Sequence, residues 1–471
     1  MSTFVVVGGD AAGMSAASKA KRDDPDLEVV VFERGQWVSY GACGLPYYIK
    51  GEIQSLEDLV SVTPEQFREE RDIDLRTGHD VVDVDPETRT VTAVDVETHE
   101  EVVQSYDSLL LATGAAATTP PIDGLEREGV YTLGSMSDGK ELREYVARAR
   151  DEGDLQQPDR GPACQFLETC EGPVGIVGGG YIGVEMAEAL AENGFEVHLF
   201  QRGDRILKSF SEATSEAVLD HLAERDVAVY LGSEVQELAG GEAVEAVVTT
   251  DERVPVEMVL VGTGVRPRTE LAEGAGIELG ETGAIATDAY RETNVPDVYA
   301  AGDCAEAEHV VTGDPVYVPL ALTANRHGRA IGQTVTGTPT EGGGVAGTAA
   351  VKAFEVEAAR TGCLDHEEAR AAGFDPITET IDAKSRAGYY PEGGTVRVTL
   401  TADRETGRVL GGSLVSEYGE GGVHRSHALV GAVTEGITLA ELSNYDLAYA
   451  PPFNTTWDPV LTAAKVLEGK R

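Results

Sequence analysis

Cys43 lies in the short segment SYGACGLPYY, between Gly41 and Gly44 and shortly before Pro46. Glycine and proline at this spacing are typical of a tight loop, and small neighbouring side chains would expose the sulfur to a reactant. A thiolate there could attack a disulfide, or peroxide could oxidise it to a sulfenic acid. An isolated cysteine is more often a small buried apolar residue. The interpretation of Cys43 therefore depends on the elements that position this loop.

The first of these elements is predicted at residues 3–34, TFVVVGGDAAGMSAASKAKRDDPDLEVVVFER. An apolar strand, a glycine turn, a helix of small residues and a second strand form the pattern of a βαβ dinucleotide site. Gly8 would permit the tight turn, Gly13 would let the helix approach the strand, and Glu33 would bind the adenosine ribose. Asp10 replaces the middle glycine of the fingerprint. The residues predicted to bind this cofactor are Gly8, Gly9, Gly13, Glu33 and Arg34.

A second unit of the same kind is predicted at residues 172–207, GPVGIVGGGYIGVEMAEALAENGFEVHLFQRGDRIL, where Gly178, Gly180 and Gly183 complete the fingerprint. An NADH site usually has a carboxylate at the end of its second strand, but this chain has Gln201 followed by Arg202. A guanidinium there could pair with the 2′-phosphate of NADPH. The alternative is that Arg202 is an ordinary solvated arginine. We therefore expect NADPH as the nucleotide, with NADH possible.

Three further segments, YDSLLLATGAAATTPPIDG, VLVGTGVRPRTEL and TNVPDVYAAGDCAE, each indicate a buried strand followed by a turn. The first two stand where a chain would leave one dinucleotide domain and return to it. In the third, the carboxylate of Asp303 would suit a ribityl hydroxyl of a flavin. Two dinucleotide sites in one chain indicate a flavoprotein that passes hydride from a nicotinamide to FAD. The additional cofactor-binding residues predicted from these turns are Thr113, Gly114, Gly264, Gly302 and Asp303.

Composition limits the class of protein. A chain of 471 residues with 41% apolar residues predicts two or three folded domains. Its 82 acidic and 37 basic residues give a formal net charge of −45, which argues against a nucleic-acid or anionic-membrane partner and favours the carboxylate-rich surface of a halophilic protein. No apolar run approaches the length of a membrane span, so we expect a cytoplasmic protein. The five cysteines show neither a metal-ligand spacing nor a disulfide framework, and Cys164 and Cys170 are interpreted as incidental.

Nearly the whole chain resembles the pyridine nucleotide-disulfide oxidoreductase superfamily, and within it the single-cysteine branch of coenzyme A-disulfide reductases, NADH oxidases, NADH peroxidases and persulfide reductases. The resemblance rests on GGDAAGMSAA, SYGACGLPYYIKGEI, LLATGA, GGGYIGVEMAEAL, AAGDCAE, LALTANRHGRAIG, GTAAVKAFEVEAARTG, AGYYPEGG and YAPPFNTTWD. It implies an α/β fold with two Rossmann-like domains and a C-terminal α+β dimerisation domain, in a homodimer. The implied boundaries are 1–120 and 251–335 for the FAD domain, 121–250 for the NAD(P) domain and 336–471 for the dimerisation domain.

The resemblance also gives Cys43 a role. Relatives that resemble glutathione reductase pair two cysteines five residues apart, but the corresponding position here is Tyr48, so Cys43 would react with an external partner. We expect reduction of coenzyme A disulfide or a related small disulfide, with NAD(P)H oxidase or coenzyme A persulfide or polysulfide reductase as alternatives. Ala11 stands where the oxidases and peroxidases have a histidine, which disfavours the peroxidase chemistry. An electron-transfer flavoprotein reductase or a redox sensor would not need the cysteine loop and an intact nicotinamide site together.

Other site residues are implied by the resemblance alone. Tyr389 and Tyr449 match two tyrosines that coenzyme A-disulfide reductases bring from the partner subunit, where a phenol can stabilise a leaving thiolate. The chain departs from that family at Ala42 and in residues 416–427, which leaves the identity of the small thiol open. The implied substrate-binding residues are Ser15, Lys19, Arg22, Ser39 and Asn325.

Overall fold

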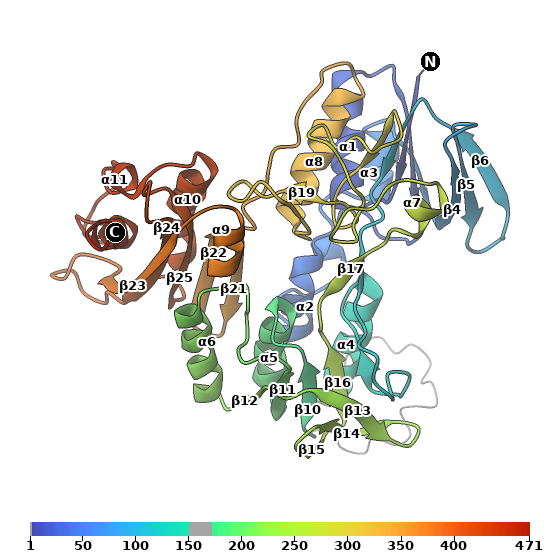
Figure 1. Cartoon of the computed structure of the whole chain (residues 1–471). Coiled ribbons are helices and arrows are strands. Elements are labelled where there is room, and N and C mark those ends of the chain that lie inside the picture. Colours follow the sequence, from blue (N-terminus) through green and yellow to red (C-terminus); the bar gives the residue numbers. More distant parts are fainter. Residues whose placement is uncertain (1, 150–171) are drawn as a thin grey trace.

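A computed structural model of the chain describes residues 2–149 and 172–471, and Cys164 and Cys170 lie outside these ranges. Two parallel sheets, each flanked by helices, are followed by a C-terminal domain built on an antiparallel sheet (Figure 1). The predicted fold class is confirmed. Within the described residues no helix combines the length and apolar character needed to cross a membrane.

The first sheet is parallel, with the order β18-β7-β1-β2-β3. Except for the edge strand Asp74–Thr77, its strands are short, largely apolar runs that helices and loops cover on both faces, as is usual for parallel sheets. They are β1 (Thr3–Val7), β2 (Glu28–Glu33), β3 (Asp74–Thr77), β7 (Ser108–Leu111) and β18 (Val298–Ala300).

Two helices pack closely beside this sheet, α1 (Ala11–Asp23) and α8 (Ala321–Thr334). A Cβ atom on Gly328 would lie 2.1 Å from the carbonyl oxygen of Ala12, and one on Gly332 would lie 2.5 Å from that of Ala16. The small residues of both helices are therefore required for this contact. As a result, residues about 310 positions apart in the sequence meet between α1 and α8.

The second sheet is also parallel, with the order β12-β11-β10-β16-β9. The predicted boundary at residue 250 would assign β16 to the first domain, whereas its parallel pairing with β10 places it in the second. An apolar run such as MVLV fits either sheet, so only the pairing decides. The strands are β9 (Val130–Tyr131), β10 (Val174–Val177), β11 (Val197–Gln201), β12 (Ala228–Leu231) and β16 (Met258–Val261).

The chain passes between the two domains through a pair of antiparallel strands, β8 (Ala115–Ala117) and β17 (Val265–Pro267). Each domain also carries a three-stranded antiparallel sheet, which the sequence analysis does not predict. These sheets consist of β4 (His79–Asp85), β5 (Thr90–Asp95) and β6 (Glu101–Ser105), and of β13 (Val235–Gly240), β14 (Val244–Thr249) and β15 (Arg253–Pro255).

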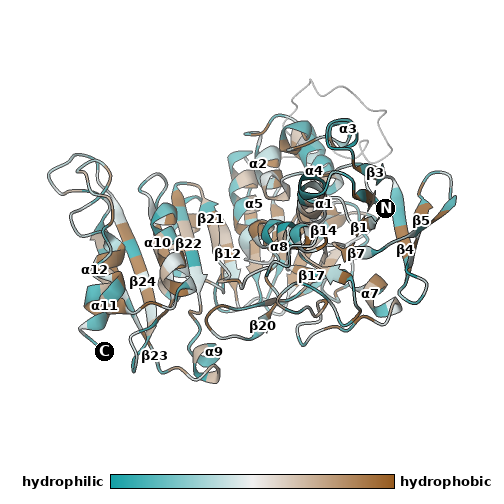
Figure 2. Ribbon diagram, turned by 90° about the horizontal axis from the view of Figure 1, so that it is seen from above, coloured by the Kyte–Doolittle hydropathy of each residue, from teal (hydrophilic) through white to brown (hydrophobic). Residues whose placement is uncertain are grey.

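The C-terminal domain is an antiparallel sheet of order β21-β22-β25-β24-β23. Figures 1 and 2 both place it at one end of the molecule, away from β4 and β5. Its strands are β21 (Ala349–Ala353), β22 (Val356–Gly362), β23 (Pro376–Lys384), β24 (Thr395–Asp403) and β25 (Val409–Glu417). Its helices are α9 (His366–Ala371), α10 (Gly422–Thr434), α11 (Leu439–Leu442) and α12 (Pro459–Glu468), and the apolar sides of α10, α11 and α12 share one core with the sheet.

A buried carboxylate, Glu188, joins all three parts of the molecule. It lies on α5 (Tyr181–Glu192) of the second domain and accepts hydrogen bonds from Lys50 at 2.6 Å, from Lys352 of β21 and from the backbone N–H of Phe354 at 2.7 Å. Although burial opposes the change, the hydrogen bonds from Lys352 and Lys50 lower the pKa of Glu188. Lys50 ends α2 (Leu45–Lys50), the helix that begins two residues after Cys43, so this ion cluster also fixes the helix behind the cysteine.

The remaining α-helices belong to the two domains that contain the parallel sheets. They are α3 (Pro64–Glu69), α4 (Met136–Ala149), α6 (Glu212–Glu224) and α7 (Glu270–Gly274).

Candidate functional site

The first glycine turn has the geometry of a dinucleotide-binding turn. Gly8 has a φ of 111°, and a Cβ atom there would lie 2.1 Å from the carbonyl oxygen of Ala112. A Cβ atom on Gly13 would lie 1.9 Å from the carbonyl oxygen of Gly8, so both positions require glycine. Glu33, at the end of β2, accepts hydrogen bonds from the N–H groups of Gly9 at 2.8 Å and Gly35 at 2.6 Å. These bonds fix its carboxylate beside the turn, where a ribose would bind.

The other predicted flavin-site residues gather around the same turn. Thr113 donates a hydrogen bond to the carbonyl oxygen of Arg268 at 2.7 Å, and burial raises the pKa of Asp303 to about 6. Burial, together with the positive charge of Arg34, lowers the pKa of Arg268. Two neighbouring guanidinium groups suit a pyrophosphate, so the residues present fit FAD. Arg268 was not predicted, although it lies in the quoted segment VLVGTGVRPRTEL.

The second glycine turn repeats this geometry. Gly178 has a φ of 114°, with its Cβ position 2.3 Å from the carbonyl oxygen of Gly262, and Gly180 faces open space. Gln201 accepts a hydrogen bond from the N–H of Gly179 at 2.9 Å through Oε1, and thus takes the place that Glu33 has in the first site. The neighbouring Arg202 is exposed. Gly183 lies on the helix side of this turn. Gly264, between β16 and β17, has a positive φ.

The redox loop, defined here as residues 38–44, carries Cys43 in a short 3-10 turn (Ala42–Gly44) immediately before α2. Two hydrogen bonds hold its backbone. The N–H of Ser39 donates to the carbonyl oxygen of Gly9 at 3.0 Å, and the N–H of Gly41 donates to the carbonyl oxygen of Leu59 at 2.9 Å. Cys43 is solvent-exposed, whereas Cys304 and Cys363 are buried. Among the cysteines that the structure describes, Cys43 is therefore the one open to a reactant.

Negative charge surrounds this cysteine. Partial burial raises the pKa of the Cys43 thiol, and the carboxylates of Glu185, Asp303 and Asp10 raise it further. Glu185 lies on α5 and accepts a hydrogen bond from the hydroxyl of Tyr47 at 3.3 Å. Burial raises the pKa of Glu185 to about 7. Glu185 was not predicted, and the signal for it is that it is one of two carboxylates, with Glu188, inside the otherwise apolar segment YIGVEMAEALA.

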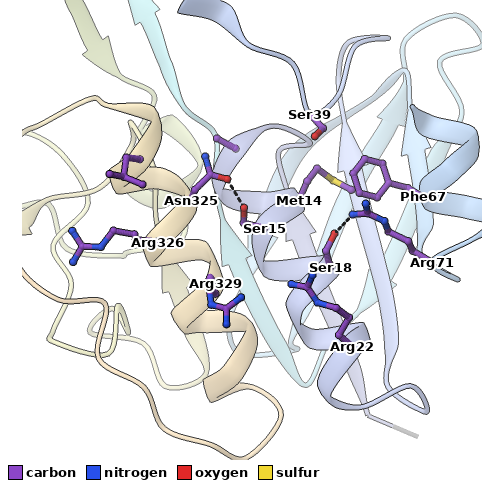
Figure 3. Close-up of a pocket in the computed structure, with 12 residues that line it drawn as sticks. Met14, Ser15, Ser18, Arg22, Ser39, Phe67, Arg71, Asn325, Arg326 and Arg329 are labelled. Atoms are coloured by element: carbon purple, nitrogen blue, oxygen red, sulfur yellow. Dashed lines mark hydrogen bonds between the residues drawn. The ribbon is translucent and has the colours of Figure 1, made fainter. Parts of the chain in front are cut away.

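A cavity of about 400 Å³ opens between α1 and α8, next to the redox loop (Figure 3). The structure brings four of the five predicted substrate residues together there, and Ser15 donates a hydrogen bond to Asn325 at 2.5 Å. Lys19 does not line the cavity; it forms an ion pair with Asp23 at 2.6 Å. Arg71, whose Nη1 donates to Ser18 at 3.0 Å, lines the cavity but was not predicted. The lining residues are Ala11, Met14, Ser15, Ser18, Arg22, Ser39, Phe67, Arg71, Leu322, Asn325, Arg326 and Arg329.

Four arginines in one cavity are unusual for a chain of net charge −45. Arg22 comes from α1, Arg71 follows α3, and Arg326 and Arg329 lie one turn apart on α8 (Figure 3). Figure 3 draws no carboxylate among the lining side chains. Guanidinium groups bind phosphates through paired hydrogen bonds, so the cavity suits a small molecule with several phosphates.

Tyr389 and Tyr449, 60 positions apart, lie together on the surface of the C-terminal domain. Their hydroxyl groups are hydrogen-bonded at 2.8 Å, and the residues are 75% and 46% exposed. Phe453 and Trp457 are also exposed, at 78% and 58%. Large aromatic side chains on a surface are typical of a contact with another molecule. Within the described residues, no group of three or more histidine, cysteine, aspartate or glutamate side chains could hold a metal ion.

Comparison with known proteins agrees with this arrangement. The sequence profile of the pyridine nucleotide-disulphide oxidoreductase family matches residues 2–328, and that of the family's dimerisation domain matches residues 348–459. An NAD(P)H coenzyme A polysulfide/persulfide reductase of Pyrococcus horikoshii is 37% identical over 98% of both chains. A coenzyme A disulfide reductase of Staphylococcus aureus is 29% identical over 96% of this chain and 97% of its own. The solved NAD-dependent persulfide reductase from A. fulgidus has a TM-score of 0.91 and 35% identity, covering all of this chain and 83% of that one.

Proposed function

This chain belongs to the pyridine nucleotide-disulphide oxidoreductase family, and we propose that it reduces coenzyme A persulfide or polysulfide with electrons from NAD(P)H. It is an NAD(P)H-dependent flavoprotein oxidoreductase. From the sequence alone, coenzyme A disulfide is the expected substrate and coenzyme A persulfide the alternative. The relatives support the reverse order, because the persulfide reductases are 37% and 35% identical and the disulfide reductase is 29% identical.

The observation that carries the proposal is the thiol of Cys43, the exposed one among the described cysteines, beside an arginine-lined cavity. Ser39 belongs both to the cavity and to the redox loop, four residues before Cys43. A phosphorylated thiol carrier such as coenzyme A could therefore place its phosphates between α1 and α8 while its sulfur end extends toward the loop. Because no second cysteine lies in the loop, the atom that Cys43 attacks must be a sulfur of the substrate.

The proposed reaction begins when the thiolate of Cys43 attacks the outer sulfur of the coenzyme A persulfide. The S–S bond breaks, coenzyme A leaves as a thiolate, and Cys43 becomes a persulfide. FAD, when bound at the first site, supplies two electrons derived from NAD(P)H at the second. With one proton these electrons convert the Cys43 persulfide to the thiolate and hydrogen sulfide. Glu185, with its pKa near 7, can hold such a proton close to this sulfur.

Coenzyme A disulfide is the second candidate substrate, favoured by the paired phenols of Tyr389 and Tyr449. Attack by Cys43 would give a mixed disulfide and release one coenzyme A thiolate, which a phenol hydroxyl could stabilise. In the homodimer that we propose, these phenols would come from the partner subunit.

Replacing both arginines of α8 that line the cavity should test the substrate. Arg326→Ala/Arg329→Ala should raise KM for coenzyme A persulfide by about tenfold or more, because a charge-assisted hydrogen bond contributes roughly 1.5–3 kcal/mol. Turnover of inorganic polysulfide, which has no phosphates, should stay near wild type. The control is Arg370→Ala, an exposed arginine on α9. Steady-state assays with coenzyme A persulfide, coenzyme A disulfide and polysulfide give the measurement.

Two results would contradict the proposal. Equal losses with polysulfide and coenzyme A persulfide would mean that the cavity does not bind the carrier. Turnover of coenzyme A disulfide far above that of the persulfide would return the assignment to disulfide reduction.

The nucleotide preference gives a second test. We propose that NADPH is used at least as well as NADH, because Gln201 replaces a carboxylate that would repel a 2′-phosphate and Arg202 lies exposed beside it. Arg202→Ala should lower kcat/KM for NADPH about tenfold and leave that for NADH nearly unchanged. Lys208→Ala, an exposed cation nearby, serves as the control. An unchanged NADPH/NADH ratio in Arg202→Ala would show that Arg202 is only a surface residue.

A further inference from the structure

Asp10 stands between β1 and α1, where the dinucleotide fingerprint usually has its middle glycine. It is the N-cap residue of α1, a position where aspartate usually accepts a hydrogen bond from the first turn of its own helix. Its carboxylate makes no such capping bond, although the N–H of Ala11 helps to lower its pKa. Instead, Oδ1 accepts a hydrogen bond from the backbone N–H of Tyr40 at 3.1 Å. The side chain therefore binds a different segment of the protein.

That segment is the redox loop. Tyr40 lies three residues before Cys43, and the neighbouring Ser39 donates its N–H to the carbonyl oxygen of Gly9 at 3.0 Å. Ser39 has a φ of 50°, a conformation that residues other than glycine adopt at a cost. Two adjacent N–H groups of the loop thus donate to the first glycine turn, one of them to the Asp10 side chain, and hold the loop where its backbone is strained.

Asp10 also acts on Cys43 through charge. Burial is the main cause that raises the pKa of the Cys43 thiol, and the negative charges of Glu185, Asp303 and Asp10 raise it further. Burial raises the pKa of Asp10 itself to about 6, with Glu33 and Asp303 contributing. Asp10 is therefore negative above about pH 6 and then opposes thiolate formation. The ionisable groups around Asp10, Tyr40 and Cys43 are Glu33 from β2, Asp303 after β18, Glu185 from α5, Asp138 from α4 and Arg268 after β17.

We propose that Asp10 is a positioning residue for Cys43: its hydrogen bond to Tyr40 fixes the redox loop, and with it Cys43, against the first glycine turn. This inference rests on the proposed function, in which the Cys43 thiolate is the nucleophile. A thiol that stays largely protonated between turnovers reacts more slowly with peroxide, because thiolate character controls oxidation.

The charge effect is measured by alkylation of Cys43 in the holoenzyme with iodoacetamide across pH, followed by mass analysis of the Cys43 peptide. Asp10→Asn removes the charge, so the midpoint of the pH profile should fall by about half a unit or more. Below that midpoint, alkylation should become about threefold faster, since half a unit is about a threefold change in thiolate. Asp26→Asn, an exposed carboxylate beyond the far end of α1, should leave the profile unchanged.

The positioning effect is measured by amide hydrogen exchange of the peptide that contains Tyr40. Asp10→Ala should raise this exchange about tenfold, whereas Asp10→Asn should stay near wild type because the amide oxygen can still accept the hydrogen bond. Equal exchange in the Ala and Asn variants, or an unchanged alkylation midpoint in Asp10→Asn, would overturn the inference. Neither readout uses a sulfur substrate, so failure of the proposed function would leave this test intact.

Discussion

The Cys43→Ser variant should lose at least about 99% of its turnover with coenzyme A persulfide and with coenzyme A disulfide. A serine hydroxyl is far too weakly acidic to replace a thiolate, and the loop holds no other cysteine. Serine differs from cysteine by a single atom, so the variant should fold and bind FAD as the wild type does. Steady-state assays together with the flavin absorbance of the purified variant measure both expectations.

Two further measurements sharpen this result. Cys363→Ala is the matched control, because burial raises the pKa of Cys363 to about 11 and keeps its thiol inert. Reduction of an artificial electron acceptor by NADPH should continue in Cys43→Ser, since hydride transfer to FAD does not require the cysteine. Residual turnover of either sulfur substrate above about a hundredth of wild type would mean that Cys43 is not the nucleophile, and would revive an electron-transfer reductase.

Activity should return when two inactive variants are combined in one dimer. One parent carries Cys43→Ser and the other carries Tyr389→Phe/Tyr449→Phe. If the tyrosine pair acts on the cysteine of the partner subunit, a heterodimer contains one site with all three residues intact. A two-fold interface builds two equivalent sites, so each heterodimer should recover about half of the wild-type activity if the sites are independent.

The structure supports this expectation through the position of the two phenols. Their hydroxyl groups are hydrogen-bonded to each other on an exposed aromatic surface of the C-terminal domain. This domain lies at the end of the molecule away from β4 and β5 (Figures 1 and 2). Mixing is confirmed by native mass analysis. Tyr390→Phe, at the neighbouring position, should remain active as a homodimer and serves as the control. Mixed dimers that stay inactive would show that the site is not shared.

Local sequence was sufficient for the parts of this protein that depend on short-range sterics. Gly8 and Gly178 adopt a positive φ, with a carbonyl oxygen where a side chain would be. Any residue but glycine would clash there, so the fingerprint alone identifies both turns. The alternation of apolar runs and small-residue helices likewise predicted the two parallel sheets, whereas the domain that follows them was implied only by the family resemblance.

Tertiary structure alone decided which distant side chains share a site. Lys19 is paired with Asp23 on its own helix, while Arg329 lines the cavity because the glycines of α8 let it pack closely on α1. Arg71 lines the same cavity from the segment after α3. The carboxylates of Asp10 and Glu185 act on the environment of Cys43 only because the first and second domains fold around the redox loop. Hydrogen-bond partners and burial are set by such long-range packing, which no spacing in the sequence records.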